Sequence, residues 1–64
     1  MKYNIRKYRE ALNLTQQELA EKAGCSRQYI NMLENDEVRN ISTKLLCALA
    51  TALNVKVDDL LFFA

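Results

Sequence analysis

The chain has 64 residues, half of them hydrophobic, with one glycine, no proline, no histidine and a formal net charge of only +1. A core this small favours one compact, well-capped helical domain over residues 1–64. No apolar run approaches the roughly 20 residues of a membrane span, and the start lacks the apolar segment of a signal peptide, so we expect a cytoplasmic protein without membrane contact.

The composition has few of the residues that metal sites and enzyme active sites use. Cys25 and Cys47 lack a metal-type spacing and histidine is absent, so no metal and no other cofactor is expected. Both cysteines are most simply small buried hydrophobes, with a redox role for Cys25 beside a helix start as the alternative. Without histidine or a converging acid–base pair, we expect no enzyme activity.

The first predicted helix covers residues 5–12, with Asn4 as its N-cap. Its inward face follows the 3.6-residue period and consists of Ile5, Tyr8 and Leu12. Arg9 falls on this same face, although an unpaired charge in a small core is costly. We therefore expect Arg9 to have a partner of opposite charge elsewhere in the chain.

Two further short helices flank the only glycine, Gly24. One covers residues 16–23, with Thr15 as N-cap and Glu18 completing a capping box. The other covers residues 27–34, with Ser26 as N-cap. Gly24 supplies the left-handed backbone that ends one helix before the next begins. Two short helices joined by a tight glycine turn indicate a helix-turn-helix.

The helix over residues 27–34 supplies the partner that Arg9 needs. Its apolar stripe is Ile30 and Leu33, and Glu34 lies beside them. We expect Arg9 and Glu34 to form a partly buried ion pair that ties the first helix to the third. In the alternative, both side chains reach water separately.

The outward face of this third helix suits recognition of DNA bases. It carries Gln28, Asn31, Met32 and Asn35, with Arg27 and Tyr29 on the flanks. Arginine can pair bidentately with guanine, and glutamine or asparagine with adenine. At the start of the preceding helix, Gln16 and Gln17 lie where backbone N–H groups and the helix dipole favour a phosphate. The alternative for both sets is an ordinary solvated face.

The second half of the chain is predicted as a loop and two helices. Residues 35–41 form the loop, where Asn35 can take the left-handed conformation that ends the third helix. A fourth helix follows the N-cap Ser42 and ends near Asn54. The tail, residues 55–64, is predicted as a final short helix. Leu61, Phe62 and Phe63 exceed what that helix can bury, so they form a candidate homodimer patch, unless they fold back onto the domain.

The chain resembles the phage-repressor-like (Cro/CI, xenobiotic-response-element type) helix-turn-helix family over about residues 3 to 62. The residues that carry the resemblance are Thr15-Gln16-Gln17-Glu18-Leu19-Ala20, Ala23-Gly24-Cys25-Ser26, Ile30 and Leu33-Glu34-Asn35. The resemblance implies an all-α, five-helix lambda-repressor-like domain that binds double-stranded DNA. It also implies a transcriptional regulator, in particular a repressor that binds an inverted-repeat operator as a homodimer.

The resemblance assigns roles to the exposed residues. Arg27 and Gln28 take the principal base-reading positions, and Asn31 and Met32 take secondary ones. The expected phosphate contacts are Gln16, Gln17, Tyr29, Asn35 and Arg39. Tyr29 reaches phosphate through its hydroxyl or lays its ring against the domain.

One segment departs from the family. Asp36 replaces the usual glycine of the loop, and the acids Asp36 and Glu37 oppose a phosphate contact there. Together with the near-neutral charge and the apolar tail, this keeps a second reading open, that of an antitoxin-like protein-interaction module on the same fold. No small-molecule ligand is evident in either reading.

Overall fold

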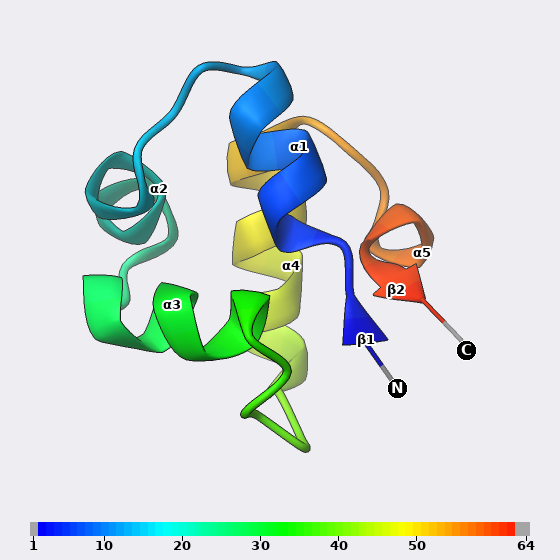
Figure 1. Ribbon diagram of the computed structural model, residues 1–64. Coiled ribbons are helices and arrows are strands. Elements are labelled where there is room, and N and C mark those ends of the chain that lie inside the picture. The colour runs from blue at the N-terminus through cyan, green and yellow to red at the C-terminus, as the bar shows by residue number, and fades with distance from the viewer. Residues whose placement is uncertain (1, 63–64) are drawn as a thin grey trace.

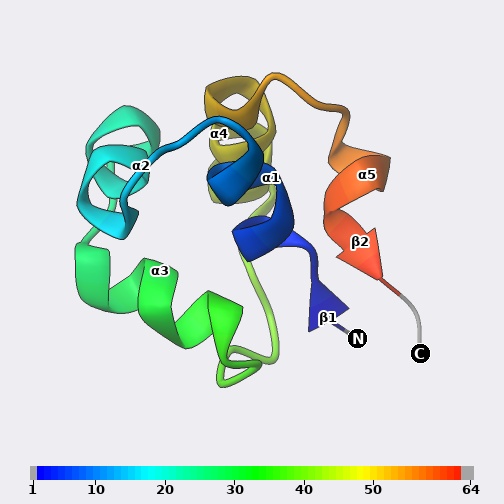
Figure 2. The ribbon, with the colours of Figure 1, turned by 45° about the horizontal axis from the view of Figure 1, so that its top comes forward.

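The computed structural model describes residues 2–62, and within this range it has the five expected helices and one short sheet. In chain order these are β1 (Lys2–Tyr3), α1 (Ile5–Ala11), α2 (Gln16–Ala23), α3 (Arg27–Glu34), α4 (Thr43–Leu53), α5 (Val57–Leu60) and β2 (Leu61–Phe62). Helices α2 and α3 lie on one side, α5 and the strands on the other, and α1 and α4 between them (Figures 1 and 2). Among residues 2–62, no helix has both the length and the apolar character that crossing a membrane requires.

Side-chain caps begin three of the helices, as the sequence predicts. The Thr15 hydroxyl accepts the Glu18 N–H at 3.0 Å, and the Glu18 carboxylate accepts the Thr15 N–H at 2.8 Å. The Ser26 and Ser42 hydroxyls each accept the N–H three residues on, at 3.1 and 3.2 Å. These bonds satisfy donors that a helix start leaves without a partner, and they fix where α2, α3 and α4 begin.

Four helices end with one residue in the left-handed region. These residues are Asn13, Gly24, Asp36 and Asn54, with φ between 57° and 78°. The N–H of the next residue then bonds to the carbonyl five residues earlier, at 2.9–3.1 Å, as in a Schellman motif. The prediction that Asn35 takes this conformation is wrong, because its φ is −98° and Asp36 takes the position instead.

Each of the five helices contributes to one apolar core. Its largest fully buried side chains are Ile5, Leu19, Ile30, Leu33, Leu49 and Leu60. Two predicted core residues do not belong to it. Leu12 is 46% exposed, since α1 ends at Ala11 and the chain turns away from the inward face. Cys47 is also exposed, on the outer side of α4, while Cys25 is half-buried.

Leu61 and Phe62 are extended rather than helical. Leu61 pairs with Tyr3, and Phe62 with Lys2, in an antiparallel sheet of two short strands. The Asn4 N–H also bonds to the Leu60 carbonyl, at 2.8 Å. The predicted helix therefore stops early, because a partner strand from the other end of the chain takes over the backbone hydrogen bonds.

This pairing bears on the candidate dimer patch. Leu61 is half-buried and packs against the core of its own domain. Phe63 and the side chain of Phe62 lie outside the part of the chain that the structure describes. Leu61 therefore already has an apolar environment within a single copy of the chain.

Candidate nucleic-acid interface

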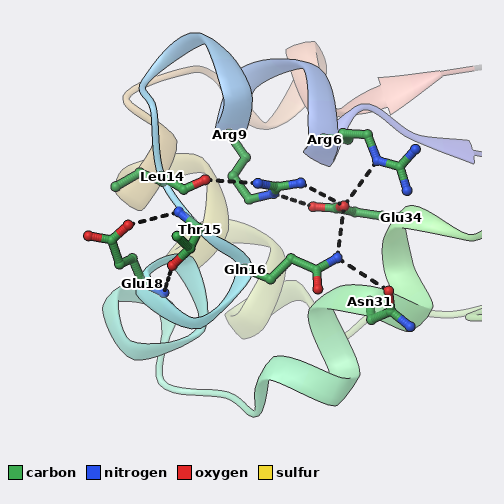
Figure 3. A network of polar contacts seen from close by, with 8 residues as sticks. All are labelled: Arg6, Arg9, Leu14, Thr15, Gln16, Glu18, Asn31 and Glu34. Carbon is green, nitrogen blue, oxygen red and sulfur yellow. Dashed lines mark hydrogen bonds and ion pairs between the residues drawn. The ribbon is translucent and has the colours of Figure 1, made fainter.

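The carboxylate of Glu34 lies at the centre of a polar network (Figure 3). Its side chain has no exposed surface, and that of Arg9 is only 12% exposed. Arg9 Nε donates to Oε2 of Glu34 at 2.6 Å, and Arg9 Nη2 donates to Oε1 at 3.1 Å. The structure thus brings together the two charges that the sequence places on apolar faces, in a bidentate pair between α1 and α3.

Further donors complete this network. Arg6 Nε lies 3.2 Å from Oε1 of Glu34, and Gln16 Nε2 lies 3.1 Å from the same oxygen. Arg9 also donates through Nη1 to the Leu14 carbonyl, at 2.8 Å. The carboxylate therefore joins α1, α2 and α3. Arg6 was detectable in the sequence, since it precedes Arg9 by three residues and so lies on the same face of α1.

The hydrogen bonds decide the charge state of this network. Burial by itself raises the pKa of Glu34, but the bonds donated by Arg9, Gln16 and Arg6 outweigh it and hold that pKa below its usual value. The bond to Glu34 raises the pKa of Arg9 in turn. Both groups are therefore charged at neutral pH, and charge-assisted hydrogen bonds fix α3 relative to α1 and α2.

Beside this network, the surface carries an open depression of about 410 Å³. It is lined by Gln16, Arg27, Gln28 and Asn31. A second depression of about 540 Å³ shares Gln16 and Arg27 with the first. Its other lining residues are Arg9, Thr15 and Gln17. Residues predicted to contact bases and residues predicted to contact phosphate thus lie on one continuous polar surface, across α3 and the start of α2.

At the start of α2, the two glutamines differ in what they can offer. Gln17 is exposed, whereas the amide nitrogen of Gln16 donates to Glu34 and, at 3.3 Å, to Oδ1 of Asn31. An anion at this helix start would meet backbone N–H groups of the first turn, which have no carbonyl four residues before them within the helix. The phosphate contacts of Gln16 and Gln17 stay predictions.

The other predicted contact residues lie at the margins of this surface. Met32 and Tyr29 are both half-buried. Tyr29 packs against the core, which is one of the two roles predicted for it. Asn35 and Arg39 are exposed. Neither Tyr29 nor the two exposed residues line the depressions given above, so their contacts with phosphate stay predictions as well.

In the loop after α3, backbone donors are used within the protein. The Glu37 N–H bonds to the Met32 carbonyl at 2.9 Å, and the Asp36 N–H bonds to the Leu33 carbonyl at 3.4 Å. Both bonds satisfy the last carbonyls of α3. These two amides therefore serve the end of the helix, which agrees with the departure of this loop from the family pattern.

The cysteines and acids offer no second type of site. Among the described residues, no cluster of three or more histidine, cysteine, aspartate or glutamate side chains could hold a metal ion. Burial raises the pKa of the Cys25 thiol, so this group is protonated at neutral pH. That state does not favour the alternative redox role for Cys25.

Comparison with known proteins places the chain in a family. The helix-turn-helix family model matches residues 5–60. The control protein C.SmaI of Serratia marcescens is 47% identical over 58 residues, which are 91% of this chain and 68% of that protein.

Two solved structures are similar throughout. The restriction-modification controller protein C.AhdI of Aeromonas hydrophila superposes with a TM-score of 0.82 at 35% identity, over 89% of this chain and 85% of that one. The master regulator for biofilm formation SinR, solved in complex with DNA, superposes with a TM-score of 0.80 at 33% identity, over 84% and 86%. The chain therefore belongs to the helix-turn-helix family of Cro/CI-type regulators.

Proposed function

We propose that this chain is a sequence-specific regulator that binds double-stranded DNA with α3 in the major groove. One observation carries the proposal: Arg27, Gln28 and Asn31 are exposed on α3 and line one depression with Gln16 of α2. Recognition helices read base edges through their N-terminal residues, and Arg27 and Gln28 are the first two residues of α3. The relative SinR, which was solved with DNA, supports this reading.

Within this proposal, base contacts and phosphate contacts separate along the surface. Arg27 and Gln28 read bases directly, and Asn31 and Met32 read them from the next turn of α3. The phosphate contacts come from the start of α2 and from the edges of α3. They are Gln17, Tyr29, Asn35, Arg39 and Gln16, the last through its backbone N–H, because its side-chain nitrogen donates to Glu34 and Asn31. Phosphate contacts position the protein, whereas base contacts carry the sequence information.

We further propose that two copies bind an inverted repeat and repress transcription by occupying promoter DNA. A single α3 covers only half a site, and a symmetric dimer presents two copies about one helical turn apart, roughly 10 bp. The dimer forms through the tail residues Leu61, Phe62 and Phe63. The apolar character of this tail and the family resemblance support the assembly.

The test of DNA recognition is selection from random duplex DNA by the purified protein at about physiological salt. An enriched inverted repeat with half-sites about one turn apart is the expected result. Enrichment of a single half-site would discard the symmetric dimer and keep base reading. If no sequence is enriched, the DNA proposal fails and the protein-interaction module becomes the leading function.

Single substitutions on α3 then test the orientation of the helix. Arg27→Ala and Gln28→Ala should each cost about 1–3 kcal/mol of binding free energy and relax the preference at one base position. Glu21→Ala, at an exposed position of α2, serves as the control. Unchanged affinity and preference in Arg27→Ala would mean that α3 does not face the bases as proposed.

The dimer is tested separately by sedimentation of the double variant Phe62→Asp, Phe63→Asp. The added charges should lower the fraction of dimer and weaken binding to two half-sites. Leu61 is left unchanged, because it packs against its own core and its replacement would also disturb the fold. An unchanged dimer fraction removes the tail from the interface.

A further inference from the structure

The charge on Glu34 decides which atoms donate and which accept in the hydrogen bonds beside α3. A carboxylate can only accept hydrogen bonds, whereas a glutamine amide has one accepting oxygen and one donating nitrogen. The nitrogen of Gln16 therefore has to face Glu34, and it lies 3.1 Å from Oε1. Because Arg9 and Arg6 bind the same carboxylate, Glu34 stays charged and the Gln16 amide cannot turn over without losing this bond.

The same constraint passes on to Asn31. The second N–H of the Gln16 amide reaches Oδ1 of Asn31 at 3.3 Å. An amide nitrogen does not accept hydrogen bonds, so Asn31 has to present its oxygen to Gln16. Figure 3 shows the nitrogen of Asn31 on the side away from Gln16. Since Asn31 is exposed and lines the depression with Arg27 and Gln28, this nitrogen lies on the proposed DNA-reading surface.

We propose that the chain of bonds from Glu34 through Gln16 fixes Asn31 as a hydrogen-bond donor toward DNA, so that it selects a base with an acceptor in the major groove. This inference rests on the proposed function. An asparagine free to turn suits adenine, with its oxygen on N6 and its nitrogen on N7. Here the oxygen is held by Gln16. Asn31 then loses the two-bond pairing with adenine and keeps only single acceptors, which are O6 and N7 of guanine, N7 of adenine and O4 of thymine, whereas cytosine offers only a donor.

Two substitutions of Asn31 test the polarity directly. Asn31→Ala removes the contact and identifies, in the selection described above, the base position at which preference is lost. Asn31→Asp keeps an oxygen for Gln16 but presents a second acceptor to DNA. At that position the preference should move away from guanine and thymine to a base with a donor, which is N4 of cytosine or N6 of adenine, and affinity for an operator with guanine or thymine there should fall about tenfold or more.

Comparison of bases at that position separates the acceptor sources. If a purine is selected, replacing it with its 7-deaza analogue should lower the affinity, because the N7 acceptor is lost. A selected thymine offers O4 instead and has no N7. Selection of cytosine by the unaltered protein would overturn the inference, because cytosine offers only a donor. So would an Asn31→Asp variant that still prefers guanine or thymine at this position.

Gln16 is a positioning residue in this arrangement, and its removal should alter specificity. In Gln16→Ala the Asn31 amide can turn, so the guanine-to-adenine affinity ratio at its position should fall about fivefold, within the range of a single base contact. If Gln16 only stabilised the fold or bound phosphate, without positioning Asn31, its removal would weaken binding to all sequences equally and leave that ratio unchanged. An unchanged ratio therefore counts against the inference.

A measurement without DNA separates this inference from the proposed function. In the free protein, exchange of the side-chain amide protons with water, followed by NMR, should be slower for Gln16 than for Asn31. It should stay slow in Asn31→Asp and become faster in Asn31→Ala. Fast exchange at Gln16 overturns the inference whatever DNA does. If the Gln16 amide protons exchange slowly but the selection from random DNA enriches no sequence, the proposed function is overturned. The inference that Asn31 reads a base then fails as well.

Discussion

Helix α2 packs against two neighbours, and the two contacts are held in different ways. Towards α4 the core supplies apolar side chains, such as Leu49 and Leu53. Towards α3 it also supplies apolar side chains, but Gln16 adds hydrogen bonds to Glu34 and Asn31. Apolar burial has little directional preference, whereas hydrogen bonds depend on angle. The helix that carries the proposed reading residues is therefore held in rotation as well as in position.

The largest expected effect lies on the apolar side. Leu49 is fully buried, so Leu49→Ala should lower the free energy of unfolding by about 2–5 kcal/mol. Chemical denaturation measures this loss, and Cys47→Ala, at an exposed position of the same helix, is the control. The base preference of the remaining folded protein should not change. Equal stability of the two variants would show that α4 does not anchor the core.

The polar side should respond with a smaller loss of stability. Glu34→Ala leaves the largely buried Arg9 without its carboxylate, which should cost about 1–3 kcal/mol. Thermal unfolding compares it with Glu21→Ala, which removes an exposed acid from α2. Glu34→Ala should also relax base preference, unlike Leu49→Ala. Equal melting temperatures of the two glutamate variants would exclude a stabilising role for the pair.

A pair of cap substitutions makes the comparison sharper. Ser26→Ala and Ser42→Ala each remove one hydroxyl that accepts an N–H at the start of α3 or α4, and each should cost about 1 kcal/mol of stability. Only Ser26→Ala loosens the first turn of α3, where Arg27 and Gln28 lie. Binding titrations should therefore show weaker DNA binding for Ser26→Ala alone. Equal weakening in both variants would remove the distinction between the two helices.

The smallest effect is confined to acidic pH. Because the folded-state pKa of Glu34 is lower than its ordinary value of 4.5, its contribution to stability is complete above that value and is lost as pH falls through the lower pKa. The stability difference between the unaltered protein and Glu34→Gln should therefore shrink on acidification. Glu18, whose pKa the bonds to Thr15 also lower, is present in both proteins and cancels. Chemical denaturation over a pH series measures this difference in the free energy of unfolding. A difference that stays constant with pH would contradict the prediction.

Local signals predicted most of the fold. Thr15, Ser26 and Ser42 mark helix starts because a cap bonds only to residues within one turn. The Arg9–Glu34 pair was predictable because each charge lies on or beside an apolar face, where an unpaired charge is costly.

Features that depend on distant segments were not predictable in this way. The hydrogen bond between Gln16 and Glu34 depends on how α2 and α3 cross. The hydrophobic periodicity of each helix does not determine that crossing. The strand at Leu61 requires its partner Tyr3. The left-handed residue after α3 is Asp36, one position beyond the predicted Asn35. Aspartate and asparagine both tolerate this conformation, so residue type alone did not decide between the two positions.

The pairing of β1 with β2 joins the two most distant parts of the described chain, whereas the helices pack against segments nearer in sequence. The entropy lost on closing a loop grows with its length, and two short strands return few hydrogen bonds for it. The helices should therefore assemble first, on the order of microseconds to milliseconds for so local a topology. The two ends should then pair last, and we expect local opening of the folded domain to begin at this strand pair.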